Sequence, residues 1–247
     1  MSFMRWIYLS PHLDDAVLSA GGLIYEQTKS GIPVEIWTFM AGTPSDTEIS
    51  QFAQLLHEQW GFASAEETVA SRREEDKTAA SIVGATTVHF DFLDCIYRRD
   101  ENGEWPYHEI SLPPHKMDMD LPRQIADMIL PRLEPDDELV CQLSVGSHVD
   151  HVLVRQAAEL LNGPLTYDVD IPYLFYKPEE LEPKSAGMKE ELYAVSETGL
   201  KAWKEAVLAY RSQLPVLGDA MSTIEKAQES IQSYWAEQKG IRLWRTG

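Results

Sequence analysis

Two short segments of the 247-residue chain combine imidazole and carboxylate side chains at the same spacing. His12 and Asp15 are three residues apart, as are His148 and His151, and this spacing directs both members of a pair to one side of a helical turn. Two imidazoles and a carboxylate, with no thiolate, are typical of catalytic zinc, because the fourth position stays open for water or substrate. The same donor types also bind Fe²⁺. The two segments together therefore predict a metal site.

The same segments are also good helix starts. Ser10 followed by Pro11 and two aspartates fits an N-cap with proline at the first helical position and acids near the positive end of the helix dipole. Ser147 with Asp150 resembles a capping box, in which Asp150 would serve only its own helix, at about 1 kcal/mol. Capping does not explain why three of the seven histidines fall at these two junctions beside aspartates. A metal site explains both segments.

Apolar, β-rich stretches alternate with helical patterns over the first two thirds of the chain, and each metal-site segment falls where a strand gives way to a helix. The alternation predicts an α/β fold with a Rossmann-like, mostly parallel sheet flanked by helices, and ligands in such sheets bind at the carboxyl ends of the strands. We expect strands at 5–10, 34–40, 86–90, 138–143 and 164–167, and helices at 15–30, 68–83, 121–133 and 149–161.

The pattern is lost between residues 95 and 120, where three prolines stand among aromatic residues and histidines. A long loop of this kind is either a lid over a site or a surface excursion. Beyond it, residues 197–214 and 219–238 show apolar side chains at helical spacing, which predicts two C-terminal packing helices rather than a cofactor surface. No linker divides the chain, so we expect one domain over residues 1–247.

Composition narrows the class of protein. Apolar residues make up 44% and charged residues 25%, which is ordinary for a globular protein. The net charge of −19 disfavours nucleic acid and other polyanions, and favours a small or neutral substrate. Two distant cysteines predict neither a disulfide nor a thiolate cluster. The N-terminal apolar run is interrupted by two aspartates, and no stretch is long enough to cross a bilayer, so we expect a cytoplasmic protein without membrane insertion.

At these residues the sequence resembles the PIG-L/LmbE-like family of N-acetylglucosaminyl-phosphatidylinositol de-N-acetylases and their bacterial relatives. That family's first motif is usually Ala-His-Pro-Asp-Asp-Glu, and this chain has Ser-Pro-His-Leu-Asp-Asp-Ala, with Ala16 in place of the Glu. Its second motif, His-x-x-His with an Asp before the last His, matches residues 148–151. Residues 72–84 are similar to the family's Arg-x-x-Glu helix, which ends in an aliphatic residue and a glycine.

The resemblance implies a Rossmann-like fold, a zinc ion, and hydrolysis of the acetamide on an amino sugar conjugate such as a derivative of N-acetylglucosamine. Carried over by position, it implies that the metal ligands are His12, Asp15 and His151. Fe²⁺ or another divalent ion fits the same donors.

The resemblance also implies roles for four further residues. Asp14 is expected to act as the general base toward the attacking water. His148 is expected to stabilise or protonate the tetrahedral intermediate, with Asp150 orienting its ring. Arg72 is expected to face the substrate, although Arg73 beside it competes for that assignment.

Two alternative functions remain open at this point. The donor set specifies activated water and says little about the acyl group, so a metal hydrolase of another amide or an ester is the nearer alternative. A non-catalytic, ligand-binding α/β module is the alternative from another class. Its only sequence support is the pair Gly21 and Gly22, which does not form a dinucleotide-binding or phosphate-binding motif. A homo-oligomer is compatible with all of these functions.

Overall fold

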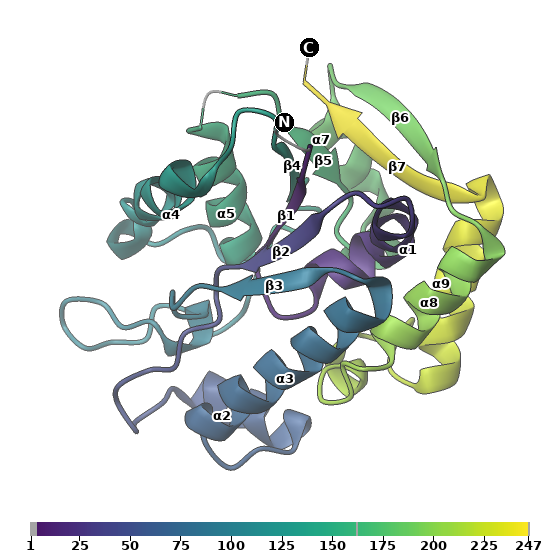
Figure 1. Ribbon diagram of the computed structural model, residues 1–247. Coiled ribbons are helices and arrows are strands. Elements are labelled where there is room, and N and C mark those ends of the chain that lie inside the picture. Colours follow the sequence, from purple (N-terminus) through teal and green to yellow (C-terminus); the bar gives the residue numbers. More distant parts are fainter. Residues whose placement is uncertain (1–3, 162, 247) are drawn as a thin grey trace.

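The computed structural model describes residues 4–161 and 163–246, and a seven-stranded sheet runs through its centre (Figure 1). The strands lie in the order β3-β2-β1-β4-β5-β7-β6. Their bounds are β1 (Trp6–Ser10), β2 (Val34–Thr38), β3 (Thr86–His89), β4 (Glu138–Gln142), β5 (Thr166–Asp168), β6 (Lys189–Ala194) and β7 (Gly240–Arg245).

The first five strands are parallel, which confirms the predicted α/β fold. β1 lies at the middle of this set, with Trp6 opposite Val34 of β2 on one side and opposite Glu138 of β4 on the other. All five residues of β1 are buried, as expected of a strand covered on both faces. Successive crossovers leave β1 in opposite directions, so a crevice forms between the carboxyl ends of β1 and β4.

Two strands that the sequence did not predict extend the sheet. β7 pairs antiparallel with β5, and β6 pairs antiparallel with β7. β6 lies in a part of the chain, between residues 168 and 196, for which no strand or helix was predicted. Both strands lie at the edge of the sheet opposite β3, so they widen the sheet away from the crevice between β1 and β4 (Figure 1).

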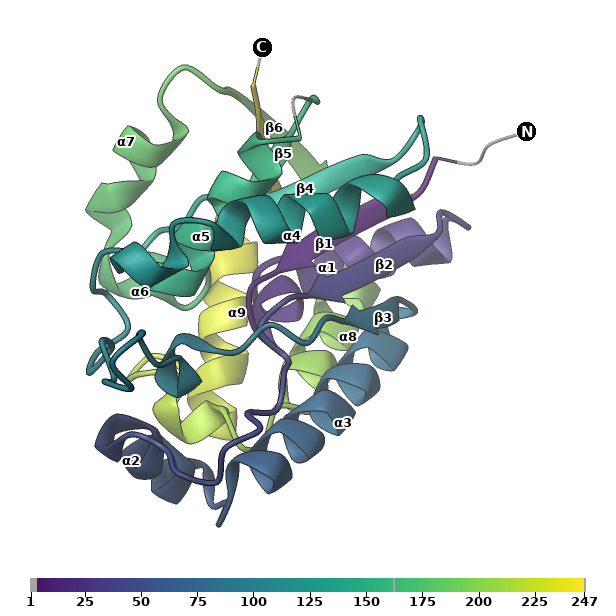
Figure 2. The same ribbon diagram turned by 90° about the vertical axis from the view of Figure 1, so that its left-hand side faces the viewer.

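Helices cover both faces of the sheet. α4 and α5 lie against one face, while α1, α3 and α8 lie on the other and α9 packs on α8 (Figure 2). The helices are α1 (Asp15–Lys29), α2 (Gln51–Trp60), α3 (Ala65–Val83), α4 (Leu121–Ile129), α5 (Val149–Glu159), α6 (Tyr173–Tyr176), α7 (Leu181–Ser185), α8 (Glu197–Val207) and α9 (Ile224–Gln238).

The helix predicted at 197–214 is wrong in its second half, because α8 ends at Val207. Tyr210 leaves the helical path and donates a hydrogen bond from its hydroxyl to Asp76 of α3 at 2.9 Å. Ser212 donates from its amide and its hydroxyl to Glu75 at 2.9 and 2.6 Å. These long-range hydrogen bonds outweigh the local helical pattern.

Two other helices begin at a different residue from the one predicted, because a capping side chain determines the start. α3 begins at Ala65 rather than at Thr68, because the Ser64 side chain accepts a hydrogen bond from the third amide of the helix. α9 begins after Thr223, which caps it in the same way, five residues later than predicted. α4 gives way after Ile129 to a 3₁₀ turn that contains a proline. α2 was missed altogether.

A small second core anchors the segment 95–120. Cys95, Ile96, Tyr97 and Tyr107 from this segment pack with apolar side chains of α2, α3 and α5. The segment has no regular strand or helix beyond two 3₁₀ turns, as predicted, and its buried residues at 95–98, 107 and 118 anchor it while residues 101–104 are exposed. Cys95 and Cys141 are both buried free thiols.

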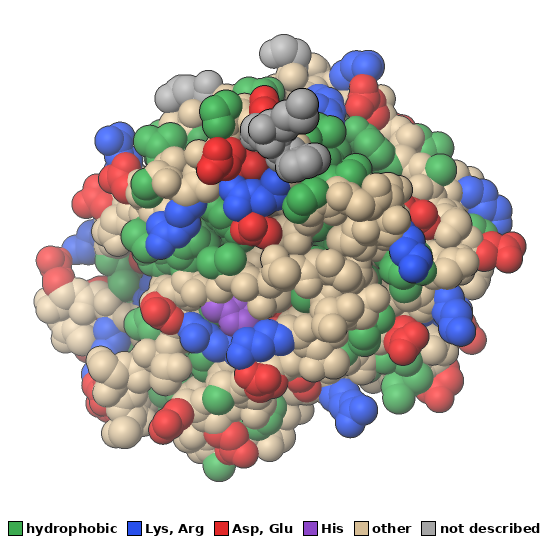
Figure 3. Space-filling view, viewed as in Figure 1, with side chains coloured by type: hydrophobic (Ala, Val, Ile, Leu, Met, Phe, Trp, Pro, Cys, Tyr) green, Lys and Arg blue, Asp and Glu red, His purple; other side chains and the backbone are tan. Residues whose placement is uncertain are grey.

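The face shown in Figure 3 carries acidic and basic side chains interspersed among apolar ones. Within the described ranges, no helix is both long enough and apolar enough to cross a bilayer.

Gly21 and Gly22 lie in the middle of α1 and allow α8 to approach it closely. A Cβ added at Gly21 would lie 2.5 Å from Cδ1 of Trp203, whose side chain is fully buried. The Trp203 indole donates a hydrogen bond to the Val17 carbonyl at 2.7 Å, which fixes the ring at this position. The glycine pair is therefore a packing feature, and it gives no support to the ligand-binding module.

We expect Gly21→Ala to destabilise the protein by about 1–3 kcal/mol, because the added methyl group overpacks the contact with Trp203. Helix propensity alone predicts the opposite sign, a gain of about 1 kcal/mol. Urea unfolding monitored by circular dichroism measures the difference. Gly163→Ala is the control, since nothing lies within 4 Å of its added methyl. A stabilised Gly21→Ala protein would contradict this account of the helix contact.

Candidate active site

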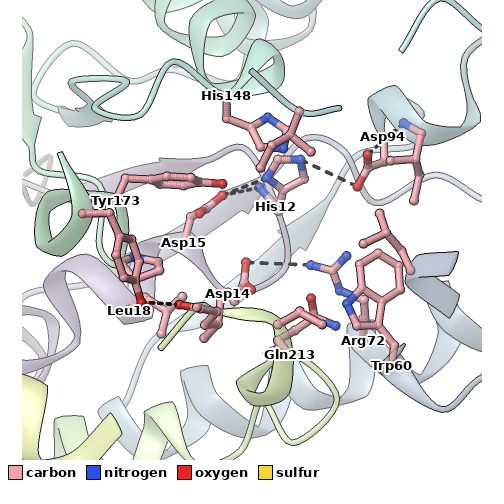
Figure 4. Close-up of a pocket in the computed structure, with 18 residues that line it drawn as sticks. His12, Asp14, Asp15, Leu18, Trp60, Arg72, Asp94, His148, Tyr173 and Gln213 are labelled. Atoms are coloured by element: carbon pink, nitrogen blue, oxygen red, sulfur yellow. Dashed lines mark hydrogen bonds and ion pairs between the residues drawn. The ribbon is translucent and has the colours of Figure 1, made fainter. Parts of the chain in front are cut away.

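A cavity of about 270 Å³ opens at the carboxyl ends of β1 and β4 (Figure 4). Five of the seven predicted site residues line it, and Asp150 and His151 lie directly behind the wall, fully buried. The polar residues around its deep end include His12, Asp14, Asp15, Arg72, Asp94 and His148.

The first segment is braced by its own hydrogen bonds. The Ser10 hydroxyl donates to the His12 carbonyl at 2.7 Å and accepts from the Ala16 amide at 3.2 Å. The His12 amide donates to Oδ2 of Asp15 at 2.7 Å. α1 begins at Asp15 with Asp14 as its N-cap, so Ser10 and Pro11 are not the cap and first residue that the helix-start interpretation required.

The second segment turns through left-handed backbone conformations. Ser144, Gly146 and Ser147 have φ values of 61°, 87° and 58°. Non-glycine residues in this region store strain, and such strain clusters at functional sites. A Cβ at Gly146 would collide with the ring of Tyr173, so that position also requires glycine for space. The turn brings His148 and the start of α5 back toward His12.

The imidazoles of His12 and His151 converge on Asp15. Oδ2 of Asp15 lies 3.2 Å from Nδ1 of His12 and 3.4 Å from Nε2 of His151. One ring nitrogen from each of His12, His148 and His151 also lies within 4.8 Å of the other two. Nε2 of His151 is buried without a hydrogen-bond partner among the described residues.

A carboxylate behind each imidazole fixes which nitrogen faces Asp15. Nε2 of His12 donates to Oδ2 of Asp150 at 3.1 Å, and Nδ1 of His151 donates to Oδ1 of Asp170 at 2.7 Å. When a cation displaces any proton from the front nitrogens, those two nitrogens and Oδ2 of Asp15 become three ligands directed at the same space. Three converging acceptors fit a divalent cation, and carboxylate-backed imidazoles are the usual arrangement behind such ions.

The electrostatics of this centre also favour positive charge. Burial lowers the pKa of His12, but Asp15 and Asp150 outweigh it and raise that pKa well above its usual range. Burial opposes ionisation of Asp15 as well, yet His151 and His12 hold its pKa well below the usual range. The donor set and the field around it are therefore suited to a metal ion.

Asp170 was missed by the sequence reasoning. Burial raises its pKa, and the hydrogen bonds from His151 and from the Val145 amide oppose that rise. One sequence signal could have pointed to it, since Asp170 follows β5 just as His12 follows β1 and His148 follows β4. A third strand of the parallel set thus contributes to the site at its carboxyl end.

Asp150 occupies a different place from the one expected. Its carboxylate contacts His12, accepts from the Cys95 amide at 3.0 Å, and lies 2.6 Å from Nη2 of Arg98. The contact of Asp150 with His148 is made by the Asp150 backbone amide, which donates a hydrogen bond to Nδ1 at 3.1 Å. The carboxylate therefore neither caps α5 nor holds the His148 ring. The helix is capped instead by the His148 side chain.

Arg98, from the segment 95–120, is a second residue that the sequence did not reveal. It is buried between Asp150 and Asp118, with Nε 3.2 Å from Oδ2 of Asp118 and the guanidinium 5.1 Å from the centre of the Tyr107 ring. The Tyr107 hydroxyl donates to Asp118 at 2.5 Å. Burial opposes ionisation of Asp150, but Arg98 and His12 keep its pKa well below the usual range.

Two other donor groups share these residues. Cys95, His148 and Asp150 form one, and His12, Asp94 and Asp150 form the other. Both depend on Asp150, which already lies against the permanent positive charge of Arg98. Coulomb repulsion from that guanidinium makes both groups poorer cation sites than the centre at Asp15.

Arg72 lines the cavity, whereas Arg73 is not among the lining residues. Nη2 of Arg72 lies 3.8 Å from Oδ1 of Asp14, and its guanidinium stands 5.1 Å from the centre of the Trp60 ring (Figure 4). Arg73 instead donates to the Ala41 carbonyl and to the exposed Asp91. Burial and the neighbouring Asp15 raise the pKa of Asp14 to about 6, and Arg72 opposes that rise.

His148 forms part of the opposite wall. Because its Nδ1 accepts a hydrogen bond from the Asp150 amide, the neutral ring carries its proton on Nε2. Burial and the nearby His12 and His151 lower its pKa well below the usual range. The neutral ring therefore offers one N–H donor.

A family model described as GlcNAc-PI de-N-acetylase matches residues 7–161, which include both metal-site segments. The chain belongs to the PIG-L family. The alanine at position 16, where this family usually has an acid, is buried in the main core of this PIG-L chain.

Relatives of this PIG-L chain extend the similarity over its whole length. A 2'-N-acetylparomamine deacetylase from Niallia circulans is 26% identical, covering 97% of this chain and 93% of the relative. A teicoplanin deacetylase solved in a zinc-inhibited form is 27% identical, with a TM-score of 0.83 and coverage of 98% and 97%. A deacetylase of the A40926 pseudoaglycone is 28% identical, with a TM-score of 0.74 and the same coverage.

In this PIG-L chain we expect Arg98→Met to lower the free energy of unfolding by about 3–5 kcal/mol, because the variant leaves Asp150 buried without its cation. Arg99→Met is the matched control. Arg99 pairs with the exposed carboxylates of Asp46 and Glu48, and such pairs are worth less than about 1 kcal/mol. Urea unfolding of both variants checks the difference, and equal losses would contradict the assigned importance of the buried pair.

Proposed function

We propose that this chain is a metal-dependent hydrolase that removes the N-acetyl group from an amino sugar conjugate of the N-acetylglucosamine type. One observation carries the proposal. Three acceptor atoms, from His12, Asp15 and His151, converge at the deep end of a cavity in which a further carboxylate, Asp14, stands free of the cluster. The relatives support it, since they are deacetylases of 2'-N-acetylparomamine, of teicoplanin and of the A40926 pseudoaglycone.

In this proposal His12, Asp15 and His151 hold the metal. A divalent ion there would supply a water of lowered pKa and polarise the acetyl carbonyl. Zn²⁺ is the first candidate, and Fe²⁺ suits the same three donors. Zinc is described as inhibiting the teicoplanin relative, so loading with each metal has to be titrated.

The chain's other residues supply proton transfer and hydrogen bonding. Asp14 takes a proton from the attacking water and passes it to the departing amine. Nε2 of His148 donates to the developing oxyanion, a contact worth several kcal/mol when it is preorganised. Arg72, held beside Asp14 and Trp60, binds the sugar. The water oxygen bonds to the acetyl carbon, the C–N bond breaks, and acetate and a free amino sugar leave.

Hydrolysis of another amide or an ester is the alternative that the same donors permit, and substrate comparison separates the two. The cytoplasmic location, the single domain and the oligomeric state stay predictions from the sequence.

We expect Asp170→Asn to weaken metal binding by about 10- to 100-fold, because the amide no longer holds Nδ1 of His151 as a carboxylate does. His151→Ala is expected to abolish tight binding. Competition with a chelating dye measures the dissociation constant for Zn²⁺ and for Fe²⁺. Asp168→Asn is the matched control, because Asp168 is also buried and lies only two residues away at the end of β5, whereas the hydrogen bond to His151 comes from Asp170. Equal affinity in Asp170→Asn and wild type would remove Asp170 from the metal site.

We expect Asp14→Asn to retain one metal per chain and to lose about 10²- to 10⁴-fold in kcat, because the amide cannot accept the proton. Amine release from an N-acetylglucosamine conjugate, followed by fluorogenic labelling, reports turnover. Asp46→Asn, at an exposed position, is the control. Full turnover by Asp14→Asn would reject the assignment of the base, and absence of deacetylation by the metal-loaded wild type would reject the proposed function.

A further inference from the structure

The mouth of the cavity is bordered by apolar side chains from four separate parts of the chain. They come from α2, from the segment 95–120, from α6 and from the turn that follows α8. All remain partly exposed, and Tyr176 keeps 42% of its surface accessible to solvent. This apolar collar consists of Leu56, Trp60, Ile110, Tyr176, Val216 and Leu217.

The collar is held in place by specific contacts. The Tyr176 hydroxyl donates to the Leu217 carbonyl at 2.8 Å and accepts from the Ala220 amide at 2.9 Å, which ties α6 to the turn. A Cβ at Gly218 would lie 2.6 Å from that hydroxyl, so the close approach depends on glycine. Across the mouth, Nε2 of His57 and the Tyr97 hydroxyl lie 2.6 Å apart and fasten α2. The apolar surface is therefore preformed.

Polarity changes sharply along the cavity. The deep end holds the metal-site residues, Asp14 and Arg72, while the collar presents carbon atoms and two aromatic rings. The enclosed volume of about 270 Å³ is slightly below the roughly 300–1,000 Å³ of pockets that surround a drug-sized ligand. A cavity of this size would take an acetylated sugar at its deep end, with whatever is attached to the sugar placed against the collar.

We propose that the substrate carries an apolar aglycone, which the collar binds while the deep end holds the acetamide. The inference rests on the proposed function and narrows its substrate class. An exposed apolar surface that rims a cavity is a mark of a ligand site, and flat rings such as those of Trp60 and Tyr176 favour stacking with another aromatic group. Continuity with the catalytic cavity identifies the occupant as part of the substrate.

A phosphate-linked aglycone fits the same mouth poorly. Arg72 is the one Lys or Arg among the described lining residues, and it is already paired with Asp14. Asp15 and Asp94 add negative charge to the lining. A phosphate group would therefore meet net repulsion where recognition of phosphate normally uses several cationic donors.

The test compares three N-acetylglucosamine derivatives on the metal-loaded enzyme: the phenyl glycoside, the methyl glycoside and the 1-phosphate. The phenyl glycoside is expected to exceed the methyl glycoside by at least about tenfold in kcat/KM, mainly through KM, which corresponds to about 1.4 kcal/mol. The 1-phosphate is expected to be no better than the methyl glycoside. Equal values for the two glycosides, or preference for the phosphate, would overturn the proposal.

A direct binding measurement tests the apolar subsite whether or not the protein is a deacetylase. Calorimetry with the deacetylated phenyl and methyl glucosaminides measures the collar's contribution whether or not turnover occurs. If no derivative is hydrolysed but the phenyl compound binds at least about tenfold more tightly, deacetylation is rejected and the apolar subsite stands. If both bind equally, the subsite is rejected whatever the turnover.

Adjacent leucines on α2 provide a matched pair of variants. Leu56→Gln places an amide in the collar and is expected to reduce the phenyl-to-methyl ratio of kcat/KM to about one. Leu55, next to it, is 51% exposed and does not line the cavity, so Leu55→Gln is expected to keep the wild-type ratio. Leu217→Gln repeats the test from the opposite side if Leu56→Gln fails to fold. A wild-type ratio in folded Leu56→Gln and Leu217→Gln would exclude the collar as the origin of the preference.

Discussion

The carboxylates buried at the carboxyl ends of the parallel strands must each be matched by hydrogen-bond donors or by a positive charge, and the structure of the site depends on this requirement. Asp150 and Asp170 are completely buried, and a carboxylate removed from water is unfavourable unless donors or a cation stand against it. Imidazole N–H groups, backbone amides and Arg98 meet that requirement behind the two converging histidines. In front of them Oδ2 of Asp15 accepts a hydrogen bond from the His12 amide and lies 3.2 Å from Nδ1 of His12 and 3.4 Å from Nε2 of His151. A divalent ion would complete this balance, so the support for metal binding comes from the surroundings as much as from the ligands.

The topology explains why the donors meet. β1, β4 and β5 are neighbours in the parallel set, and each delivers a site residue just beyond its carboxyl end. The left-handed turn between β4 and α5 then reverses the chain sharply enough for His148 and His151 to face His12. A fold of this kind supports many reactions, and the chemistry of this one depends on a few side chains at one edge of the sheet.

The sequence predicted what depends on local pattern. The parallel strands, the first helix and both metal-site segments follow from periodicity and from residue types at strand-to-helix junctions. β6 and β7 were missed because their pairing joins segments that are distant along the chain, and α8 was overextended because hydrogen bonds from Tyr210 and Ser212 to α3 end it. Arg98 could not be found because it lies in an irregular segment and its role depends on meeting Asp150 in space. The polar residues at the deep end could be predicted from two short motifs. The collar could not, because its residues come from four parts of the chain that meet only in the folded structure.

The segment 95–120 both lines the cavity and supports the buried charges behind it. Ile96 and Ile110 face the cavity, while Arg98 supplies the counter-charge behind His12. A loop exchange intended to give this enzyme a relative's substrate range would therefore also change the support of the metal centre, unless the graft preserved Arg98 with its partners Tyr107 and Asp118. Side chains of α2 and of the turn after α8 border the same cavity without contacting Asp150 or Asp170, so substitutions there can reshape the cavity while these buried carboxylates keep their partners.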